Sequence, residues 1–331
     1  MSDPLATRAE AARPARAHAL RDILRTLRLP LAIGGLLIIF SLAEPRILSL
    51  GNLRNVAVQA SYLAIFAMAQ TVVILTRGFD LSLGFTVSLV SVTASLTMVA
   101  MGGGPESIFH GIAVGIALAA GIGLANGLLI AGIGINPLVT TLGMANVVMA
   151  FASTISGGFP VTGLPSSLNA WLSQATFLTI PAPIWFAALV FLILTFTLRA
   201  TRFGRYLYII GANPQAAVAA GIRTRPVLVM AYVLCAVLTA LGAILLTART
   251  GSGEPTLGGN LTLEAIAAAV VGGVHLSGGE GGVGAAVLGA LFITVLSNGM
   301  NLVQIDGYLQ QICLGVIIII SLIVSRDASR R

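Results

Sequence analysis

The stretch LAIGGLLIIF, residues 31–40, decides the fold class, because it is apolar without interruption. The stretch GVIIIISLIV, residues 315–324, has nearly the same character close to the other end of the chain. Only helices and closed barrels satisfy every backbone polar group in lipid, and barrel strands alternate apolar and polar side chains. Continuous apolar runs therefore predict a bundle of membrane helices, an all-α polytopic integral membrane protein.

The composition agrees with a chain whose main solvent is the bilayer. Of the 331 residues, 57% are hydrophobic and only 9% are charged, and the mean hydropathy is +0.99. A soluble domain carries about 25% charged residues. All 18 basic residues are arginines. The absence of lysine excludes a Walker A phosphate loop and Schiff-base chemistry, so this chain is not expected to hydrolyse ATP.

No metal site or disulfide framework is expected. Cys235 and Cys313 lie inside apolar runs, where a buried free thiol is the ordinary state. The three histidines, His18, His110 and His275, are too scattered to suggest a metal site. The net charge of +7 does not require nucleic acid, because the arginines stand at the ends of apolar segments, as membrane topology places them.

Ten apolar segments are candidates for membrane spans, each close to the about 20 residues that cross a bilayer. They are residues 30–43, 56–76, 82–101, 110–132, 137–157, 183–199, 226–247, 261–275, 283–302 and 308–325. The first and eighth segments are short, and eight or nine full spans with re-entrant pieces are an open alternative. The first segment is expected to be a retained helix, since a cleaved signal peptide has a shorter charged region before it.

The arginines predict the orientation. With an even number of spans and a cytoplasmic N-terminus, 15 arginines lie in inner segments and 3 in outer ones, as the positive-inside rule requires. We expect a cytoplasmic tail at residues 1–28, a transmembrane domain at 29–325 and a cytoplasmic tail at 326–331. The longest outer loop, residues 158–182, carries Trp171; it either docks an external partner or caps the bundle.

An arginine-flanked stretch, FGRYLYIIGANPQAAVAAGIRTRP at residues 203–226, interrupts the apolar pattern. Asn213 is a good N-cap, Pro214 suits the first helical position, and Gly221 can end the helix in a left-handed conformation. This predicts a helix of about two turns at 213–221, with Gly211 as a flexible entry. Its interface candidates are Gly211, Asn213, Pro214, Ala216, Ala217 and Gly221. The small-residue face either docks in a cleft of another protein or lies on lipid headgroups as a plain connector.

Three other stretches hold polar residues between apolar runs. TRGFDLSLG, residues 76–84, contains Asp80 and Ser82. Because a carboxylate at the bilayer centre costs about 2.5–3.5 kcal/mol on insertion scales, Asp80 faces water, lines a polar cavity or caps the next helix. GINPLVTTLGM, residues 134–144, has a second Asn-Pro helix start. LTLEAIAAAVVGGVHLSGGEGG, residues 261–282, contains Glu264 and a glycine-rich loop.

These four stretches, in this order, resemble the permease subunits of bacterial ribose-type sugar ABC importers. The resemblance covers about residues 30–325 and rests on Gly78–Gly84, Asn213–Ile222 and Leu276–Gly279. It implies the ABC importer permease fold in the bacterial inner membrane, without a cofactor. It also implies that the 213–221 helix couples to a separate ATP-binding cassette subunit. The other implied partners are a second permease, identical or different, and an external sugar-binding protein, with lipid around the bundle.

The departures from the family pattern are small. Phe79 stands where isoleucine is commoner, and the N-terminal tail is long and rich in arginine. The LSGGE stretch at residues 276–280 resembles the nucleotide-contacting signature of ATPase subunits. Since this chain has no ATPase core, the stretch is interpreted as a cytoplasmic turn near the motor. Relatives carry different sugars, so the resemblance leaves the cargo open.

A path for a neutral, hydroxyl-rich solute is expected to use polar uncharged groups. The path candidates are Asp80, Ser82, Asn126, Asn136 and Thr141. A second hypothesis is an ion-coupled secondary transporter with Asp80 or Glu264 as its proton or sodium site, because such sites often use buried carboxylates and broken helices. That hypothesis leaves the 213–221 helix without a role.

Overall fold

The computed structural model describes residues 27–328, and these are mostly helical. Of the predicted tails, residues 1–26 and 329–331 lie outside the described residues, and residues 326–328 form the end of a helix. Seven helices in this part are long and apolar enough to cross a membrane. They are α2 (Leu50–Ile74), α3 (Leu83–Ala100), α4 (Ser107–Gly127) with its π-helical extension η2 (Leu128–Ile133), α5 (Pro137–Ser156), α7 (Ala182–Ala200), α10 (Thr224–Thr250) and α12 (Val283–Leu302).

Three further apolar helices are shorter. They are the helix Leu27–Ala43, α11 (Leu261–Gly272) and the described apolar part of α13, Gly307–Ile317; α13 itself runs over Gly307–Ala328. Each predicted span coincides with a helix, but only seven of the helices in residues 27–328 reach spanning length. The multi-pass membrane bundle is confirmed, whereas the count of ten spans stays a prediction.

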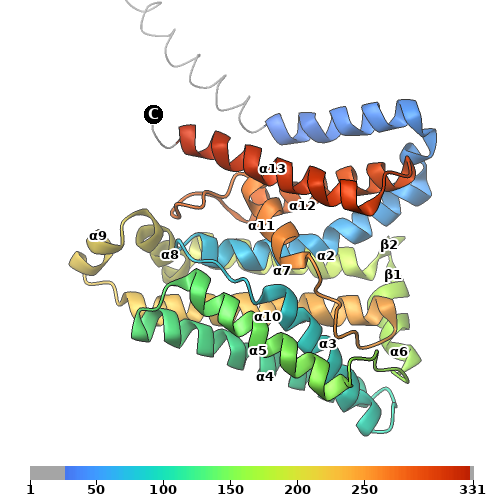
Figure 1. Ribbon diagram of the computed structural model, residues 1–331, viewed down its shortest axis with the longest axis horizontal. Coiled ribbons are helices and arrows are strands. Elements are labelled where there is room, and N and C mark those ends of the chain that lie inside the picture. The colour runs from blue at the N-terminus through green and yellow to red at the C-terminus, as the bar shows by residue number, and fades with distance from the viewer. Residues whose placement is uncertain (1–26, 329–331) are drawn as a thin grey trace, which may run out of the picture.

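The remaining elements lie at the two ends of the bundle (Figure 1). Helices α8 (Arg202–Ala212) and α9 (Pro214–Ala219) project at one end, together with the loop between α11 and α12; we call this the α9 end. The opposite end carries α6 (Ser166–Asn169), η3 (Ala170–Gln174) and the hairpin of β1 (Thr176–Phe177) and β2 (Ile180–Pro181); we call this the hairpin end. A short 3-10 helix, η1 (Pro45–Leu48), precedes α2.

Helix α2 is the centre of the core. A helix that is hydrophobic on all sides is buried on all sides, and every residue from 60 to 76 is buried. Helices α7, α10, α11 and α12 pack around it.

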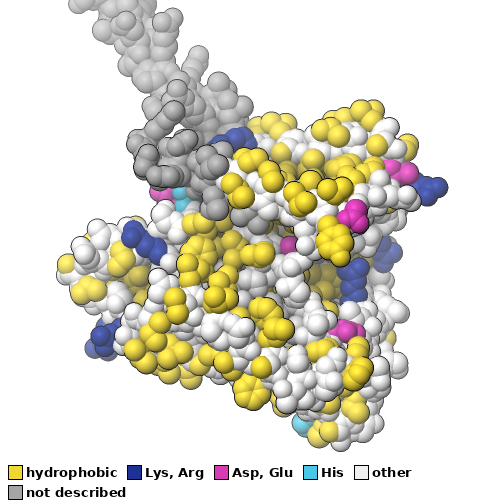
Figure 2. All heavy atoms as spheres, viewed as in Figure 1, with side chains coloured by type: hydrophobic (Ala, Val, Ile, Leu, Met, Phe, Trp, Pro, Cys, Tyr) yellow, Lys and Arg dark blue, Asp and Glu magenta, His cyan; other side chains and the backbone are white. Residues whose placement is uncertain are grey.

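By contrast, α5, α7 and α13 expose many large apolar side chains. Figure 2 shows apolar and uncharged side chains over most of the visible face, with the arginines gathered mainly towards the two ends. This distribution is that of a surface facing lipid or other membrane subunits.

Two sets of three helices build the inside of the bundle. In the first set, residues 75–82 join α2 to α3, and α4 follows; in the second, residues 251–260 join α10 to α11, and α12 follows. Helix α2 packs along α12 and α10 along α4, while α3 packs on α4 and α11 on α12. The sets run in opposite directions (Figure 1). The second set therefore repeats the packing of the first in inverted orientation, an arrangement known from membrane transporters.

Small residues let these helices approach closely. A Cβ added to Gly123 of α4 would lie 2.6 Å from the Tyr232 carbonyl oxygen of α10, and one on Gly127 would lie 2.8 Å from the Val229 Cα atom. Gly123 and Gly127 therefore lie on the face of α4 that packs against α10. Gly121 of the same helix has open space around it. In lipid such close backbone approach replaces the hydrophobic drive between helices.

Candidate functional site

Helix α9 has the capping that the sequence predicts. The Asn213 side-chain oxygen accepts hydrogen bonds from the backbone N–H groups of Gln215 and Ala216, both at 3.0 Å. Pro214 occupies the first helical position. Gly221 has φ of +76°, the left-handed conformation expected after a helix end. The element is a short helix with fixed ends, and Pro214–Ala219 is its hydrogen-bonded part.

The face that α9 presents differs from the prediction. Ala217 is fully buried at 0% exposure, and Val218 is 61% exposed. Ala217 therefore packs against its own chain and is not part of the exposed surface of α9, whereas the coupling role of the helix stays a prediction. The exposed surface of α9 is formed by the residues on either side of Ala217, namely Pro214, Gln215, Ala216, Val218 and Ala219.

Gly211 is a packing residue and not the flexible entry that we predict from sequence. It lies inside α8 and is buried. A Cβ at this position would clash with the Leu75 carbonyl oxygen and the Gly279 nitrogen. The reason is the close approach of three segments, residues 75–77, 211–212 and 278–279, which we call the three-segment junction.

Hydrogen bonds hold the three-segment junction together. Arg77 donates from Nε to the Gly211 carbonyl oxygen at 2.5 Å and from a terminal guanidinium nitrogen to the Ala212 carbonyl oxygen at 2.6 Å. The Gly279 N–H donates to the Leu75 carbonyl oxygen at 2.9 Å. The glycine-rich loop of residues 276–280 therefore packs against the end of α2 and against α8, next to α9.

Tyr208 ties α8 to the same loop. Its hydroxyl donates to the Gly281 carbonyl oxygen at 3.0 Å. Burial raises the pKa of the Tyr208 hydroxyl, although the Arg199 charge acts against this. The hydroxyl thus remains a donor at physiological pH.

Three of the five path candidates lie together. Asp80 and Ser82 are buried, and Asn126 of α4 is fully buried beside them. The Asp80 Oδ1 atom accepts from the Ser82 N–H at 2.9 Å and from the Ser82 hydroxyl at 2.5 Å. The Asn126 amide nitrogen donates to the Ser82 hydroxyl oxygen at 3.0 Å. This buried cluster of Asp80, Ser82 and Asn126 keeps one unpartnered acceptor, the Asn126 Oδ1 atom.

The beginnings of α3 and α11 meet next to the buried cluster. The Gly84 N–H of α3 donates to the Thr262 hydroxyl oxygen of α11 at 2.8 Å. The Gly258 N–H, from the segment before α11, donates to the Ser88 hydroxyl oxygen at 2.9 Å. Further along α3, the Thr247 hydroxyl donates to the Ser91 hydroxyl oxygen at 2.7 Å. A polar seam therefore runs along the inner face of α3.

Sequence reasoning misses this seam, although a signal is present. Its α3 members, Ser88 and Ser91, are three positions apart, the spacing of neighbours on one helix face. Thr262 is the second residue of α11, and Ser82 is the N-cap of α3, so both lie at helix starts that follow loops. Arg77 is also missed, because its place beside an apolar run looks like an ordinary topology signal.

The other two path candidates lie elsewhere. Asn136 is exposed and caps α5, where its side-chain oxygen accepts from the Leu138 N–H at 2.9 Å. Thr141 is buried, and its hydroxyl donates to the Pro137 carbonyl oxygen of the same helix at 2.8 Å. Both therefore have local roles in α5, and they do not join the buried cluster. Glu264 lies in the first turn of α11, where the helix dipole stabilises a carboxylate.

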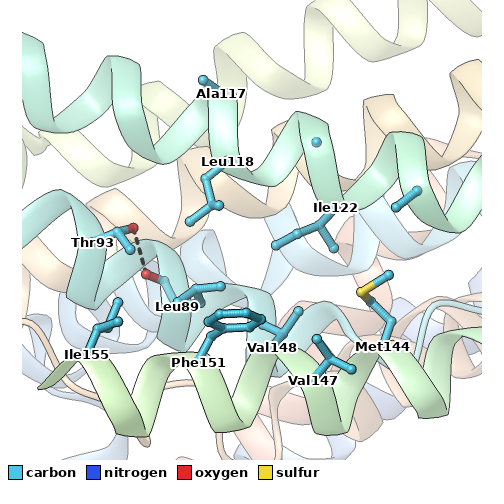
Figure 3. A pocket seen from close by; sticks show the side chains of 12 residues that line it. Leu89, Thr93, Ala117, Leu118, Ile122, Met144, Val147, Val148, Phe151 and Ile155 are labelled. Atoms are coloured by element: carbon cyan, nitrogen blue, oxygen red, sulfur yellow. Dashed lines mark hydrogen bonds between the residues drawn. The ribbon is translucent and has the colours of Figure 1, made fainter. Parts of the chain in front are cut away.

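A groove of about 500 Å³ lies between α3, α4 and α5 (Figure 3). Its lining is almost wholly apolar, and Phe151 and Val148 of α5 face Leu118 and Ile122 of α4 across it. The hydroxyl of Thr93 donates to the Leu89 carbonyl oxygen at 2.7 Å. The groove thus offers no free polar group to a sugar and fits lipid chains or apolar side chains instead.

A smaller, polar pocket of about 400 Å³ opens at the hairpin end. Arg54 of α2 and Arg249 of α10 line it, together with Asn55, Ser173 and Gln174. Arg249 lies over the Tyr62 ring, 5.4 Å from its centroid. Two arginines in one polar pocket make it a site for a carboxylate or another anionic group.

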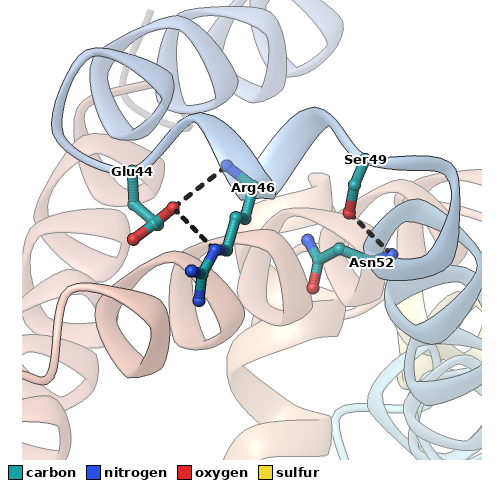
Figure 4. Close-up of polar contacts among 4 residues, drawn as sticks. All are labelled: Glu44, Arg46, Ser49 and Asn52. Carbon is teal, nitrogen blue, oxygen red and sulfur yellow. Dashed lines mark hydrogen bonds and ion pairs between the residues drawn. The ribbon is translucent and has the colours of Figure 1, made fainter.

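The start of α2, from which Arg54 projects, is fixed by local contacts (Figure 4). The Ser49 hydroxyl oxygen accepts from the Asn52 N–H at 3.3 Å and caps α2. The Asn52 amide nitrogen donates to the Asn298 side-chain oxygen of α12 at 2.9 Å. Before this turn, the Glu44 carboxylate accepts from the Arg46 N–H at 3.1 Å and pairs with its guanidinium at 3.8 Å.

The two cysteines differ in burial, and the long loop at the hairpin end packs against the bundle. Cys235 is buried as predicted, whereas Cys313 is exposed on α13, because α13 has neighbours on one side only. Within residues 27–328 there is no group of three metal-binding side chains. The predicted loop at 158–182 hydrogen-bonds to the end of α10 through Asn169, whose amide donates to the Ala248 carbonyl oxygen at 2.7 Å. This contact supports the capping interpretation of the loop.

Comparison with known proteins gives the family. Residues 52–322 match the family described as the branched-chain amino acid transport system / permease component. The ribose import permease protein RbsC of Escherichia coli K12 is 34% identical over 292 residues, which cover 87% of this chain and 90% of the relative. The chain belongs to this permease family. No solved structure matches.

Other relatives in the family are similar to the same extent. RbsC of Bacillus subtilis 168 is 36% identical over 295 residues, with 89% of this chain and 90% of the relative covered. The galactose/methyl galactoside import permease protein MglC of Escherichia coli K12 is 36% identical over 300 residues, with 86% and 89% covered. The predicted resemblance to ribose-type permease subunits is confirmed. Together with the seven apolar helices, it identifies a multi-pass membrane permease.

Proposed function

We propose that this chain is the membrane-spanning subunit of an ATP-driven importer for a monosaccharide or a sugar derivative. Two copies, or this chain and a different permease, would enclose the path, and a separate ATP-binding cassette subunit would hydrolyse ATP. An external binding protein would deliver the sugar. The relatives named above are import permeases for ribose and for galactose and methyl galactoside, which supports a sugar as cargo.

The observation that carries the coupling role is the rigid, capped helix α9 at one end of the bundle. Its one buried residue, Ala217, fixes it to the chain, and Val218 and its neighbours face outwards. A short helix with fixed ends can transmit a push from a soluble partner, because it moves as a unit with α8. We propose that the exposed face of α9 sits in a cleft of the ATPase subunit.

The topology follows from the same arrangement. We propose ten spans, with the α9 end and both termini in the cytoplasm and the hairpin end outside the inner membrane. The three further apolar helices would then also cross the bilayer. This orientation places most arginines inside. It also turns the polar pocket of Arg54 and Arg249 outwards, where it can receive acidic side chains of the binding protein.

Within the bundle, the buried cluster of Asp80, Ser82 and Asn126 is the candidate polar contact for the sugar. The unpartnered Asn126 Oδ1 atom is an acceptor for a hydroxyl group, and a buried acceptor without a partner is costly until it binds one. Asn136 and Thr141 would act through the position of α5. We assign no catalytic residue and no cofactor.

Ion-coupled transport is not favoured by the residues found. Asp80 Oδ1 is already bonded to Ser82, and Glu264 lies at the start of a different helix. The decisive experiment reconstitutes the chain in vesicles with its ATPase and binding protein, and offers radiolabelled ribose, galactose and allose separately. We expect uptake of at least one sugar that requires ATP and both partners. Uptake by this chain alone, driven by a proton or sodium gradient, would refute the proposal.

A further inference from the structure

We propose that Arg77 is a positioning residue that links the α8–α9 unit to the buried cluster, so that a movement of α9 shifts residues 75–82. The inference rests on the proposed function, because it assigns the route by which force from the ATPase reaches the path. Arg77 precedes Asp80 by three residues, and it is the one side chain of the segment 75–82 that bonds to α8.

The contact between Arg77 and α8 is directed at the helix end. The last carbonyl groups of a helix have no partner within the helix, and those of Gly211 and Ala212 accept from the Arg77 guanidinium. A cation at this position also interacts favourably with the negative end of the helix dipole. Because Asn213 and α9 follow directly, any displacement of α9 moves the two acceptors of Arg77.

The backbone segments around Arg77 approach one another closely. Arg77 has φ of +65°, a left-handed conformation that residues with a side chain rarely adopt. A Cβ on Gly278 would lie 2.6 Å from the Arg77 Cγ atom, and one on Gly279 would lie 2.6 Å from the Ala212 nitrogen. The backbones of the three segments are therefore in close contact at the glycines, and the exposed Arg77 side chain bonds across this contact.

Beyond Arg77 the segment leads directly into the bundle. The Tyr232 hydroxyl of α10 donates to the Phe79 carbonyl oxygen at 3.3 Å. The next residue is Asp80, whose carboxylate is bonded to Ser82, and Ser82 is bonded to Asn126 of α4. A shift of residues 75–82 consequently changes the hydrogen bonds of this segment to Asn126 of α4 and to Tyr232 of α10.

Other arginines at the α9 end do not bridge segments in this way. The Arg205 guanidinium donates to the Ala200 carbonyl oxygen, five residues earlier, at 3.5 Å. Arg223 is exposed at the start of α10. Arg223→Ala therefore removes the same charge at the same end of the bundle and serves as the matched control for Arg77→Ala.

The test uses the complete transporter with its ATPase and binding protein in vesicles, supplied with whichever of ribose, galactose and allose the unchanged complex imports. For Arg77→Ala we expect the ATPase to remain bound and to hydrolyse ATP, while sugar imported per ATP falls about tenfold, within the usual range of coupling between sites. Arg223→Ala should keep the wild-type ratio. An Arg77→Ala complex with the wild-type ratio would overturn the inference.

Hydrogen exchange of residues 75–82 separates coupling from a merely structural role. In the unchanged complex we expect a nucleotide analogue to change the rate of exchange in this segment. In Arg77→Ala we expect the rate to be the same with and without the analogue. If Arg77→Ala does not assemble, Arg77→Lys keeps the charge and one donor, and its ratio should fall less; a wild-type ratio and response would again refute the link. Uptake that needs no ATP in the unchanged complex would instead refute the proposed function.

Discussion

At the scale of single residues, capping is predictable and burial is not. Asn213 and Gly221 take the roles that their chemistry indicates, because N-capping and left-handed glycine depend on local sequence alone. Which side of α9 faces the chain depends on where α8 and α10 place it. The burial of Ala217 therefore could not be inferred from the local sequence, in which Ala216 and Ala219 are chemically identical to it.

The first residue-scale prediction concerns the exposed face of α9. We expect Val218→Arg to leave the protein folded in the membrane and to abolish binding of the ATPase, because the new charge stands on the docking face. Ala217→Arg should instead lower the thermal stability of the purified chain, since it places a charge and a long side chain at a fully buried position. Co-purification of the ATPase and thermal unfolding in detergent measure the two effects. Normal ATPase binding by Val218→Arg would contradict the docking role.

The second residue-scale prediction concerns the buried cluster. Ser82→Ala removes the hydroxyl that donates to Asp80 and accepts from Asn126. It leaves buried polar groups unpaired, which costs about 1–3 kcal/mol. We expect a lower unfolding temperature and reduced sugar uptake. Ser166→Ala, at an exposed position of α6, should change neither, and equal behaviour of the two variants would remove Ser82 from the polar network.

At the scale of elements, the ten apolar helices follow the hydrophobic runs closely, whereas the amphipathic helix α8 is missed. Its arginines look like flanks of the next helix, although Gly204, Leu207, Ile210 and Gly211 recur at helical spacing and are buried. The short length of α11 could be anticipated from its glycine-rich borders. The contact between α11 and α3 could not be anticipated, because it joins segments that are far apart in the sequence.

Two glycines of α4 provide a prediction on helix packing. Gly123→Ala brings a Cβ within 2.6 Å of the α10 backbone, and such overpacking costs about 1–3 kcal/mol. Gly121→Ala, on the same helix, has nothing within 4 Å of the added Cβ. It should be neutral or slightly stabilising, because alanine favours the helix. Thermal unfolding of both variants in the same detergent decides this; if they lose equal stability, α4 and α10 do not approach as described.

At the scale of the whole molecule, two inverted helix sets bring the beginnings of α3 and α11 together inside the bundle. Asp80, Ser82 and Asn126 of the first set are buried and bond to one another, and beside them the Gly84 N–H donates to the Thr262 hydroxyl oxygen of the second set. The inverted arrangement could not be predicted from the sequence. Small residues are enough to let the helices of the two sets pack closely, and the two sets share no repeated sequence motif that would reveal it. The composition predicts the membrane bundle, and only the three-dimensional arrangement shows that the α9 end is connected to this interior.

The orientation of the molecule gives the last prediction. Gln215 is exposed on α9, and Gln174 lines the polar pocket at the hairpin end. In a chain with Cys313 replaced by serine, leaving only the buried Cys235, we expect Gln215→Cys to react with a membrane-impermeant maleimide in inside-out vesicles and not in intact cells. Gln174→Cys should show the opposite pattern, because the proposed topology puts the two ends on opposite sides of the membrane. Disruption of the membrane with detergent should expose both thiols and serves as the control. Labelling of Gln215→Cys in intact cells would place α9 outside, where no ATPase could reach it.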